Sequence, residues 1–161
     1  MRFEHLSSYD AAPDEVYAMH TDPAFREKVC TFVKSPSHTV RVEGTGDSVS
    51  VTVDQTQRVR KVPAFAAKLV GETIQILQVE RWTTPAAADL ELTIPGKPGH
   101  LRGMVALDQT ATGTEQRVTG ELTVGIPLVG RKLEGLIEGL LKRFWDAEQK
   151  VGTAWLAGER D

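Results

Sequence analysis

The sequence predicts an α+β fold, in which a sheet of about seven antiparallel strands is combined with two short helices after the first strand and a long C-terminal helix. Three observations lead to this prediction. Prolines and acidic residues follow an alternating N-terminal strand, a long middle region alternates with the period of β-strands, and the last region repeats apolar residues every three or four positions. A chain of 161 residues is long enough to form one domain, 1–161, with a buried core.

The N-terminal segment predicts a strand followed by two short helices. Residues 2–10 alternate as a half-buried strand does. Pro13 suits the first turn of a helix, while Asp22 and Pro23 end that helix and begin the next. The predicted inner face of the strand is formed by Phe3, His5, Ser7 and Tyr9.

The middle of the chain is predicted to form the remaining six strands. Residues 62–72 interrupt them with a brief helical segment that Gly71 ends, and residues 95–99 and 110–114 are expected turns. The expected strand segments are HTVRVEGTGDSVSVTVDQTQRVR, which holds two strands around the turn at 44–47, TIQILQVERW, DLELTIP, HLRGMVALDQT and EQRVTGELTVGI.

The last region predicts one amphipathic helix, with Pro127 near its start and Gly158 as its stop. Gly135 and Gly139 fall inside it, and each costs roughly 1 kcal/mol relative to alanine. A helical wheel places them opposite the apolar stripe, so we interpret them as a weak point on the solvated face, which would also let the helix flex as a lid. The alternative is close backbone approach to a second molecule or to the segment at 62–72. The stripe comprises Leu133, Leu136, Ile137, Leu140, Leu141, Phe144, Val151 and Trp155.

Composition and motifs exclude several classes of protein. A net charge of -3 and a pI of about 5.8 argue against a nucleic-acid partner bound through a broad basic surface. Cys30 is the only cysteine, so no intramolecular disulfide is expected. The histidines are scattered without metal-ligand spacing, and no phosphate-binding or dinucleotide motif occurs, so neither a metal nor a cofactor is expected. Without a signal peptide or an apolar span, a cytoplasmic protein is expected.

This order of elements resembles the START-like superfamily, also called SRPBCC, which includes the birch-pollen allergen. The resemblance is carried by YDAAPDEVYAMHTDPAFRE at 9–27 and by the long helix after VGIPLVG, and it covers essentially the whole chain. Through VPAFAAKLVG followed by VERW, the chain is also similar to an uncharacterised bacterial family of that superfamily, a domain of unknown function.

The resemblance implies a helix-grip fold, in which a curved antiparallel sheet holds the C-terminal helix and a hydrophobic cavity lies between them. Members bind lipids, sterols, polyketides, plant hormones or quinones, and others are cyclases, hydrolases or co-chaperones. The fold alone therefore leaves the function open, and the superfamily has no universal catalytic motif that could be carried over to this chain.

The candidate ligand-binding residues combine the apolar stripe with polar groups expected to point inward, and each has a plainer alternative. The stripe residues would otherwise complete a packed core, His5 would be a core or rim histidine held by a neighbour, and Trp82 would be a core tryptophan. Gln55 and Gln57 would mark where their strand leaves the core. The full set is His5, Gln55, Gln57, Trp82, Ile137, Leu140, Leu141 and Phe144.

The expected function is binding or carriage of a small hydrophobic molecule such as a lipid, fatty acid or polyketide. One alternative is a cyclase- or dehydratase-like enzyme with His5 or Glu80 as its acid–base group, although Glu80 is expected to be exposed; burial would raise its pKa. A second alternative is a partner-binding module without a ligand. Arg58, Arg60 and Lys61 are interpreted as a solvated strand end, or as a cluster that steers anionic headgroups.

Overall fold

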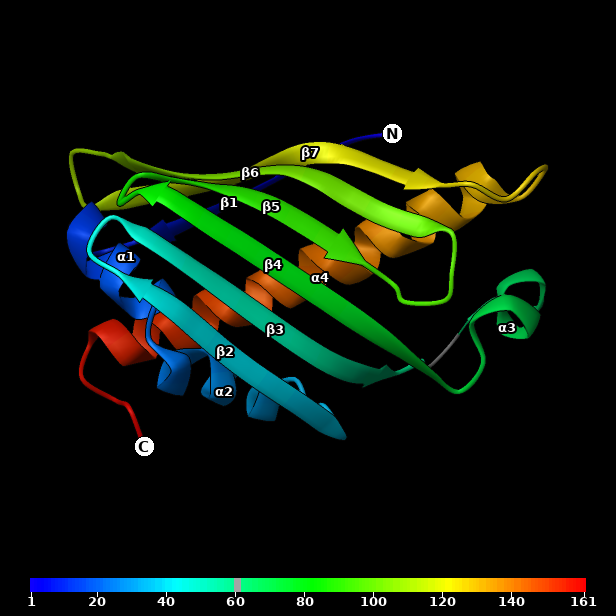
Figure 1. The fold of residues 1–161 in the computed structure, drawn as a ribbon, viewed down its shortest axis with the longest axis horizontal. Coiled ribbons are helices and arrows are strands. Elements are labelled where there is room, and N and C mark those ends of the chain that lie inside the picture. The colour runs from blue at the N-terminus through cyan, green and yellow to red at the C-terminus, as the bar shows by residue number, and fades with distance from the viewer. Residues whose placement is uncertain (60–61) are drawn as a thin grey trace.

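The computed structural model describes residues 1–59 and 62–161 and confirms the predicted helix-grip fold (Figure 1). Arg60 and Lys61, two of the three residues in the predicted basic cluster, lie outside the described residues. In chain order the elements are β1 (Arg2–Tyr9), α1 (Pro13–His20), α2 (Pro23–Phe32), β2 (Ser37–Thr45), β3 (Ser48–Arg58), α3 (Ala64–Val70), β4 (Thr73–Thr84), β5 (Ala87–Thr93), β6 (Gly99–Gln109), β7 (Thr114–Val124) and α4 (Gly130–Leu156).

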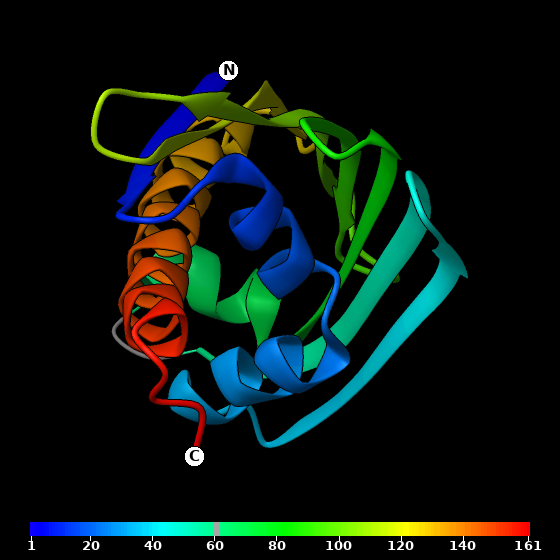
Figure 2. The same cartoon turned by 90° about the vertical axis from the view of Figure 1, so that its left-hand side faces the viewer.

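The seven described strands form one antiparallel sheet in the order β1-β7-β6-β5-β4-β3-β2. From β2 to β7 each strand pairs with the next one in the chain, with α3 between β3 and β4, and β1 joins the sheet beside β7. Alternate residues of each central strand are buried, as expected for a sheet covered on one face. Figure 2 shows the sheet curving around α1, α2 and α4, so the buried face is concave.

The two short helices begin where the sequence predicts. Pro13 occupies the first position of α1 and Pro23 the first position of α2, where the missing N–H would have no helical partner. The carboxylate of Asp22 accepts a hydrogen bond of 2.9 Å from the backbone N–H of Ala24 and so caps α2. The tight break between the helices brings both of them against α4.

Helix α4 follows the predicted stripe, rotated toward Leu141 and Trp145, both of which are buried. Gly135 faces open space, because a Cβ built there meets no atom within 4 Å. Gly152 is different: a Cβ at this position would lie 2.8 Å from Cε1 of Tyr9, so glycine allows close packing of α4 on β1. Among the described residues, no helix combines the length and the apolar character needed to cross a membrane.

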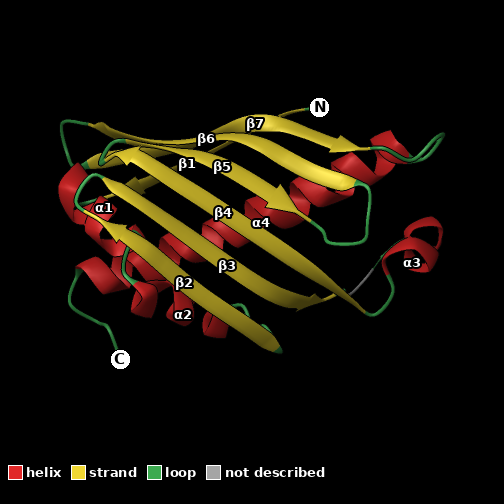
Figure 3. Cartoon of the chain, in the orientation of Figure 1, coloured by secondary structure: helices red, strands yellow, loops and turns green. Residues whose placement is uncertain are grey.

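The buried apolar residues fall into two groups. The larger group lies between the sheet layer and helices α1, α2 and α4, which Figure 3 shows on one side of the strands. The smaller group consists of Ala66 of α3, Val124 of β7 and Leu133 of α4. Ile137 of α4 packs against both groups. Through Ala66, α3 therefore packs over one end of the space between the sheet and α4.

Candidate functional site

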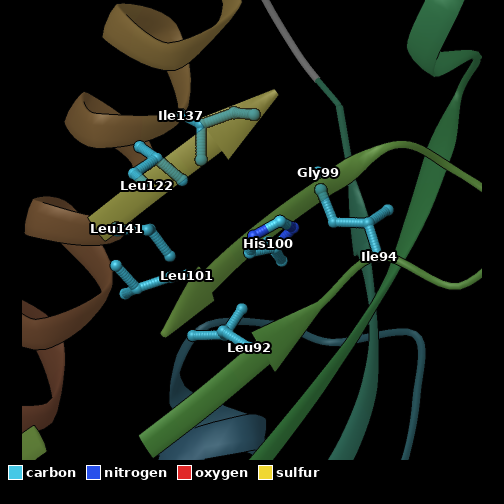
Figure 4. A pocket seen from close by; sticks show the side chains of 8 residues that line it. All are labelled: Leu92, Ile94, Gly99, His100, Leu101, Leu122, Ile137 and Leu141. Atoms are coloured by element: carbon cyan, nitrogen blue, oxygen red, sulfur yellow. The ribbon is translucent and has the colours of Figure 1, made fainter. Parts of the chain in front are cut away.

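A small apolar pocket lies between the sheet and α4, near the end covered by α3. Figure 4 shows side chains of β5, β6, β7 and α4 around it. Its cavity volume is only about 10 Å³, roughly the space of one water molecule. Ligand sites for drug-sized molecules usually measure roughly 300–1,000 Å³, so this pocket is nearly closed and a ligand of that size would enter only if it widened. The lining residues are Leu92, Ile94, Gly99, His100, Leu101, Leu122, Ile137 and Leu141.

Two of the predicted stripe residues, Ile137 and Leu141, line this pocket. Leu140 lies at the edge of the stripe with 39% of its surface exposed and does not line the pocket. Phe144 is half-buried, and its ring packs edge-on against Trp145 at 6.0 Å between centroids. The helical period therefore selects the correct helix face, while the pocket occupies only one portion of that face.

His5 points inward with Phe3, as the alternation of β1 predicts, but its ring is engaged by neighbours. Its Nε2 lies 2.8 Å from a carboxylate oxygen of Asp146, and its Nδ1 lies 3.5 Å from the hydroxyl of Ser7. The three side chains resemble a Ser–His–Asp arrangement only in composition, because Ser7 is buried whereas Asp146 is 67% exposed. A nucleophile needs access to its substrate, so this geometry favours a positioned histidine near the rim.

The two glutamines of β3 bond to each other. Nε2 of Gln57 donates to Oε1 of Gln55 at 2.6 Å, and Gln55 is buried. Both continue the inner face of Val51 and Val53, as predicted. They do not line the apolar pocket. Because they bond to each other, they form a polar continuation of the inner face of the sheet.

Trp82 is buried in the core on the inner face of β4. Its indole Nε1 donates to Oε1 of Glu80 at 3.1 Å, and its ring stacks on His20 with 6.0 Å between centroids. Tyr17 meets the same indole edge-on. The indole N–H is therefore occupied by a buried carboxylate of the chain.

The expectation that Glu80 is exposed is wrong: only 3% of its surface is accessible. The guanidinium of Arg26 donates two hydrogen bonds to its carboxylate, at 2.8 and 3.1 Å, and Nε2 of Gln78 donates a third at 2.6 Å. Burial alone would raise the pKa of Glu80, but the attraction of Arg26 and these donors lower the pKa below the usual carboxyl value. The carboxylate is thus held ionised.

A second buried carboxylate extends this arrangement into a charge cluster, defined here as Arg26, Glu80, Glu148, His20 and Gln116. Nη1 of Arg26 lies 3.6 Å from Glu148, whose other oxygen accepts a hydrogen bond of 3.3 Å from Gln116. Oε1 of Gln116 lies 2.5 Å from Nε2 of His20. Because α1, α2, β4, β7 and α4 each contribute one member, the cluster ties the helices to the sheet.

At the charge cluster, two buried polar atoms have no hydrogen-bond partner among the described residues, namely the hydroxyl of Tyr9 and Nδ1 of His20. Burial lowers the pKa of His20 and raises the pKa of Tyr9, so both rings are neutral near pH 7. The aromatic rings of Phe25 and Trp82 pack around His20. This end of the interior is therefore filled by side chains.

Comparison with known proteins identifies the family. A family model described as "Protein of unknown function (DUF2505)" matches residues 4–156. The chain belongs to the DUF2505 family. Its similarity to the uncharacterized protein Rv0481c of Mycobacterium tuberculosis is 29% identity over 126 residues, which cover 73% of this chain and 72% of that protein.

Solved structures show that this DUF2505 chain has a START-like fold. A Thermus thermophilus protein, TTHA0849, matches with a TM-score of 0.63 at 18% identity and covers 94% of this chain and 93% of its own. The di-domain ARO/CYC protein StfQ from the steffimycin biosynthetic pathway matches with a TM-score of 0.66 at 12% identity and covers 95% of this chain and 50% of its own. Ara h 8.0201 matches with a TM-score of 0.56 at 15% identity and covers 94% of this chain and 97% of its own.

Sequence reasoning missed the partners that make Glu80 a buried residue of this DUF2505 chain. Arg26 sits between Phe25 and Val29 on the buried face of α2, and Glu148 occupies a stripe position of α4. A single charge inside an apolar stripe is the signal that could have found each of them. The apolar pocket itself holds one titratable residue among its lining, His100.

Proposed function

We propose that this chain binds, and can carry, a small hydrophobic molecule such as a lipid, a fatty acid or a polyketide-like compound in the apolar pocket. The observation that carries the proposal is the lining of that pocket, where leucine and isoleucine side chains from three strands and α4 face one another. An apolar ligand would be removed from water there, which is favourable in proportion to the area buried.

Ligand uptake would require the narrow pocket to widen. The pocket adjoins the smaller apolar group under α3, because Ile137 belongs to both linings. Displacing α3 or the turn at 95–99 would therefore extend the pocket without disturbing the charge cluster. The glycine-interrupted first half of α4 offers a further route, since a Cβ built at Gly135 would meet no atom within 4 Å.

The geometry gives less support to an acid–base enzyme. Glu80 is committed to Arg26, Gln78 and Trp82, and His5 to Asp146, so neither is free to exchange a proton with a pocket ligand. The likeness to StfQ is a likeness of fold, and function on a shared fold depends on the site. Binding is therefore the function that we propose.

The test is a fluorescence titration with N-phenyl-1-naphthylamine, with palmitic acid as a competitor, on the wild type and two tryptophan variants. Ile137→Trp places a larger side chain in the pocket and should weaken probe binding by roughly tenfold or more. Leu140→Trp, at the partly exposed edge of the same helix face and outside the pocket lining, is the matched control and should bind as the wild type does. Thermal melting shows whether each variant is folded.

Absence of probe binding by the wild type would contradict the proposal. Equal losses in the two variants would also contradict it, because Leu140 does not line the pocket. Competition by palmitic acid that disappears in Ile137→Trp, while Leu140→Trp retains it, would establish the apolar pocket as the binding site.

A further inference from the structure

Exposed apolar residues gather at one end of the molecule, around α3 and the loop before α4. Figure 1 shows both segments at the end of the long axis that is far from α1 and α2. Phe65 of α3 is 39% exposed and Leu128 of the loop is 102% exposed. We call this surface the apolar tip, and it comprises Pro63, Ala64, Phe65, Ala67, Pro127 and Leu128.

Leu128 is held out into solvent by a loop that is fixed on both sides. The backbone N–H of Gly125 donates to Pro98 at 2.8 Å, and that of Gly130 donates to Ile126 at 2.9 Å. Ile126 and Val129 pack into the apolar group below. Leu128 itself has a φ of 72°, a left-handed conformation that is unfavourable for leucine. With 102% of its surface exposed, Leu128 gains no burial among the described residues that would offset this strain.

Basic side chains surround the apolar tip. Arg58, Lys68, Arg131 and Lys132 are exposed, and the ammonium of Lys132 lies 5.7 Å from the centroid of the Phe65 ring. Among the described residues, none of these four forms a salt bridge.

Few acidic side chains offset these basic groups. Glu134 is paired with the Met1 ammonium through a hydrogen bond of 2.8 Å. Among the described residues around α3, Glu72, two positions after the helix, is the acidic residue that remains. This end is therefore basic, although the chain as a whole carries a net charge of -3.

We propose that the apolar tip docks on an anionic phospholipid bilayer. Leu128 and Phe65 would enter the boundary between headgroups and acyl chains, and the basic side chains would meet the lipid phosphates. A bilayer accepts both the protruding apolar residues and the charges around them, whereas a nucleic acid would leave Leu128 in water. The inference goes beyond the proposed function, because docking on a bilayer does not require a ligand in the pocket.

Co-sedimentation with vesicles tests this proposal. The wild type should bind vesicles of phosphatidylglycerol mixed with phosphatidylcholine, and high salt should weaken the binding. Leu128→Gly and Phe65→Ser should each reduce binding by roughly tenfold, because each removes one inserted side chain. Phe32→Ser is the matched control, since Phe32 is 52% exposed on α2, a helix that Figure 1 shows away from α3.

Stability separates docking from misfolding. Glycine adopts the backbone conformation of Leu128 without strain, so Leu128→Gly should melt at the same or a higher temperature while it loses vesicle binding. The orientation is tested by Leu128→Cys labelled with an NBD dye, whose emission should shift to the blue on anionic vesicles. The same dye at Phe32→Cys should not shift, and the buried Cys30 is shielded from labelling.

Three results would overturn docking on an anionic bilayer. They are no binding by the wild type, equal binding to vesicles of phosphatidylcholine alone, and an equal loss in Phe32→Ser. Concentration-dependent dimers that Leu128→Gly abolishes, without vesicle binding, would assign the apolar tip to a second copy of the chain instead. None of these results bears on the naphthylamine titration, which is made without vesicles.

Discussion

The two ends of the interior are enclosed by the same sheet and the same helix, yet they are built from different chemistry. At one end β4 and α4 turn Glu80 and Glu148 inward against Arg26, and at the other end β5 and α4 turn Leu92 and Leu141 toward each other. Opening the charged end would separate buried charges, whereas opening the apolar end would separate weak dispersion contacts. A ligand is therefore expected to enter the apolar end.

Helix α4 shows the same contrast along its length. Its C-terminal half holds Gly152 tightly against Tyr9 and Met19, and Trp155 packs against Phe25. Its N-terminal half contains Gly135 in open space. The helix is thus tightly packed beside the charge cluster and has its lowest local stability beside the apolar pocket. This difference in local stability is what opening at only one end requires.

The largest expected effect is that of removing the positive charge from the charge cluster. Arg26→Met leaves Glu80 and Glu148 buried together without a counter-ion, and removal of one partner from a buried pair typically costs about 3–5 kcal/mol. We expect a loss of that order in the free energy of unfolding, measured by urea denaturation at pH 7.

The matched control is Arg117→Met, because Arg117 bridges Glu4 and Glu115 at the surface, where water screens the pair. It should leave the unfolding midpoint nearly unchanged. A small effect in both variants would mean that the charge cluster does not hold the filled end together, and that the two ends do not differ in their resistance to opening.

The sequence predicts the fold well because the fold depends on periodicity, which is a local property. Alternation placed His5, Gln55 and Trp82 on the inner face, and the helical period placed Ile137 on the buried face of α4. These local patterns could not show that Glu80 is buried. Burial of its charge depends on the guanidinium of Arg26, which lies 54 positions away on α2. The apolar neighbours of Arg26 in α2 can indicate that its side chain is buried, but they do not show which carboxylate it meets, because that depends on tertiary geometry.

The pocket was harder to predict than the fold for the same reason. Ile137 and Leu141 were identified from α4, but the opposing wall of Leu92, Leu101 and Leu122 reads in the sequence as ordinary strand core. Whether facing apolar residues touch or leave a space depends on the curvature of the sheet, which side-chain alternation does not encode.

A smaller effect is expected on acidification, because protonation weakens the charge cluster without removing its members. The pKa of His20 is lowered in the folded chain, so the unfolded chain takes up a proton first and stability should begin to fall below the ordinary histidine value of 6.5. The pKa of Glu80 is also lowered, so its contribution is present above 4.5 and is lost as the pH falls through its folded value.

Urea denaturation at a series of pH values would follow both steps. His20→Gln should abolish the decline that starts near 6.5 and retain the decline below 4.5, because glutamine does not titrate. An unchanged profile in His20→Gln would show that another group is responsible for the first step. Rising stability on acidification would contradict both assignments.

The smallest expected effect concerns the weak end of α4. Gly135→Ala should raise the free energy of unfolding by about 0.5–1 kcal/mol, because alanine is the better helix former and its Cβ meets nothing within 4 Å. Gly152→Ala is the contrasting variant and should lower stability, since its Cβ would be only 2.8 Å from the Tyr9 ring.

Hydrogen exchange then connects this helix weakness to the pocket. If opening proceeds through the first half of α4, Gly135→Ala should slow amide exchange across residues 130–140 and slow the uptake of naphthylamine by the same factor, because both would depend on one opening equilibrium. Slower exchange with unchanged uptake would separate the two events and assign opening to α3 or to the turn at 95–99. Uniformly slow exchange along α4 in the wild type would remove flexing of this helix from the mechanism, leaving Gly135 as a tolerated residue on a solvated face.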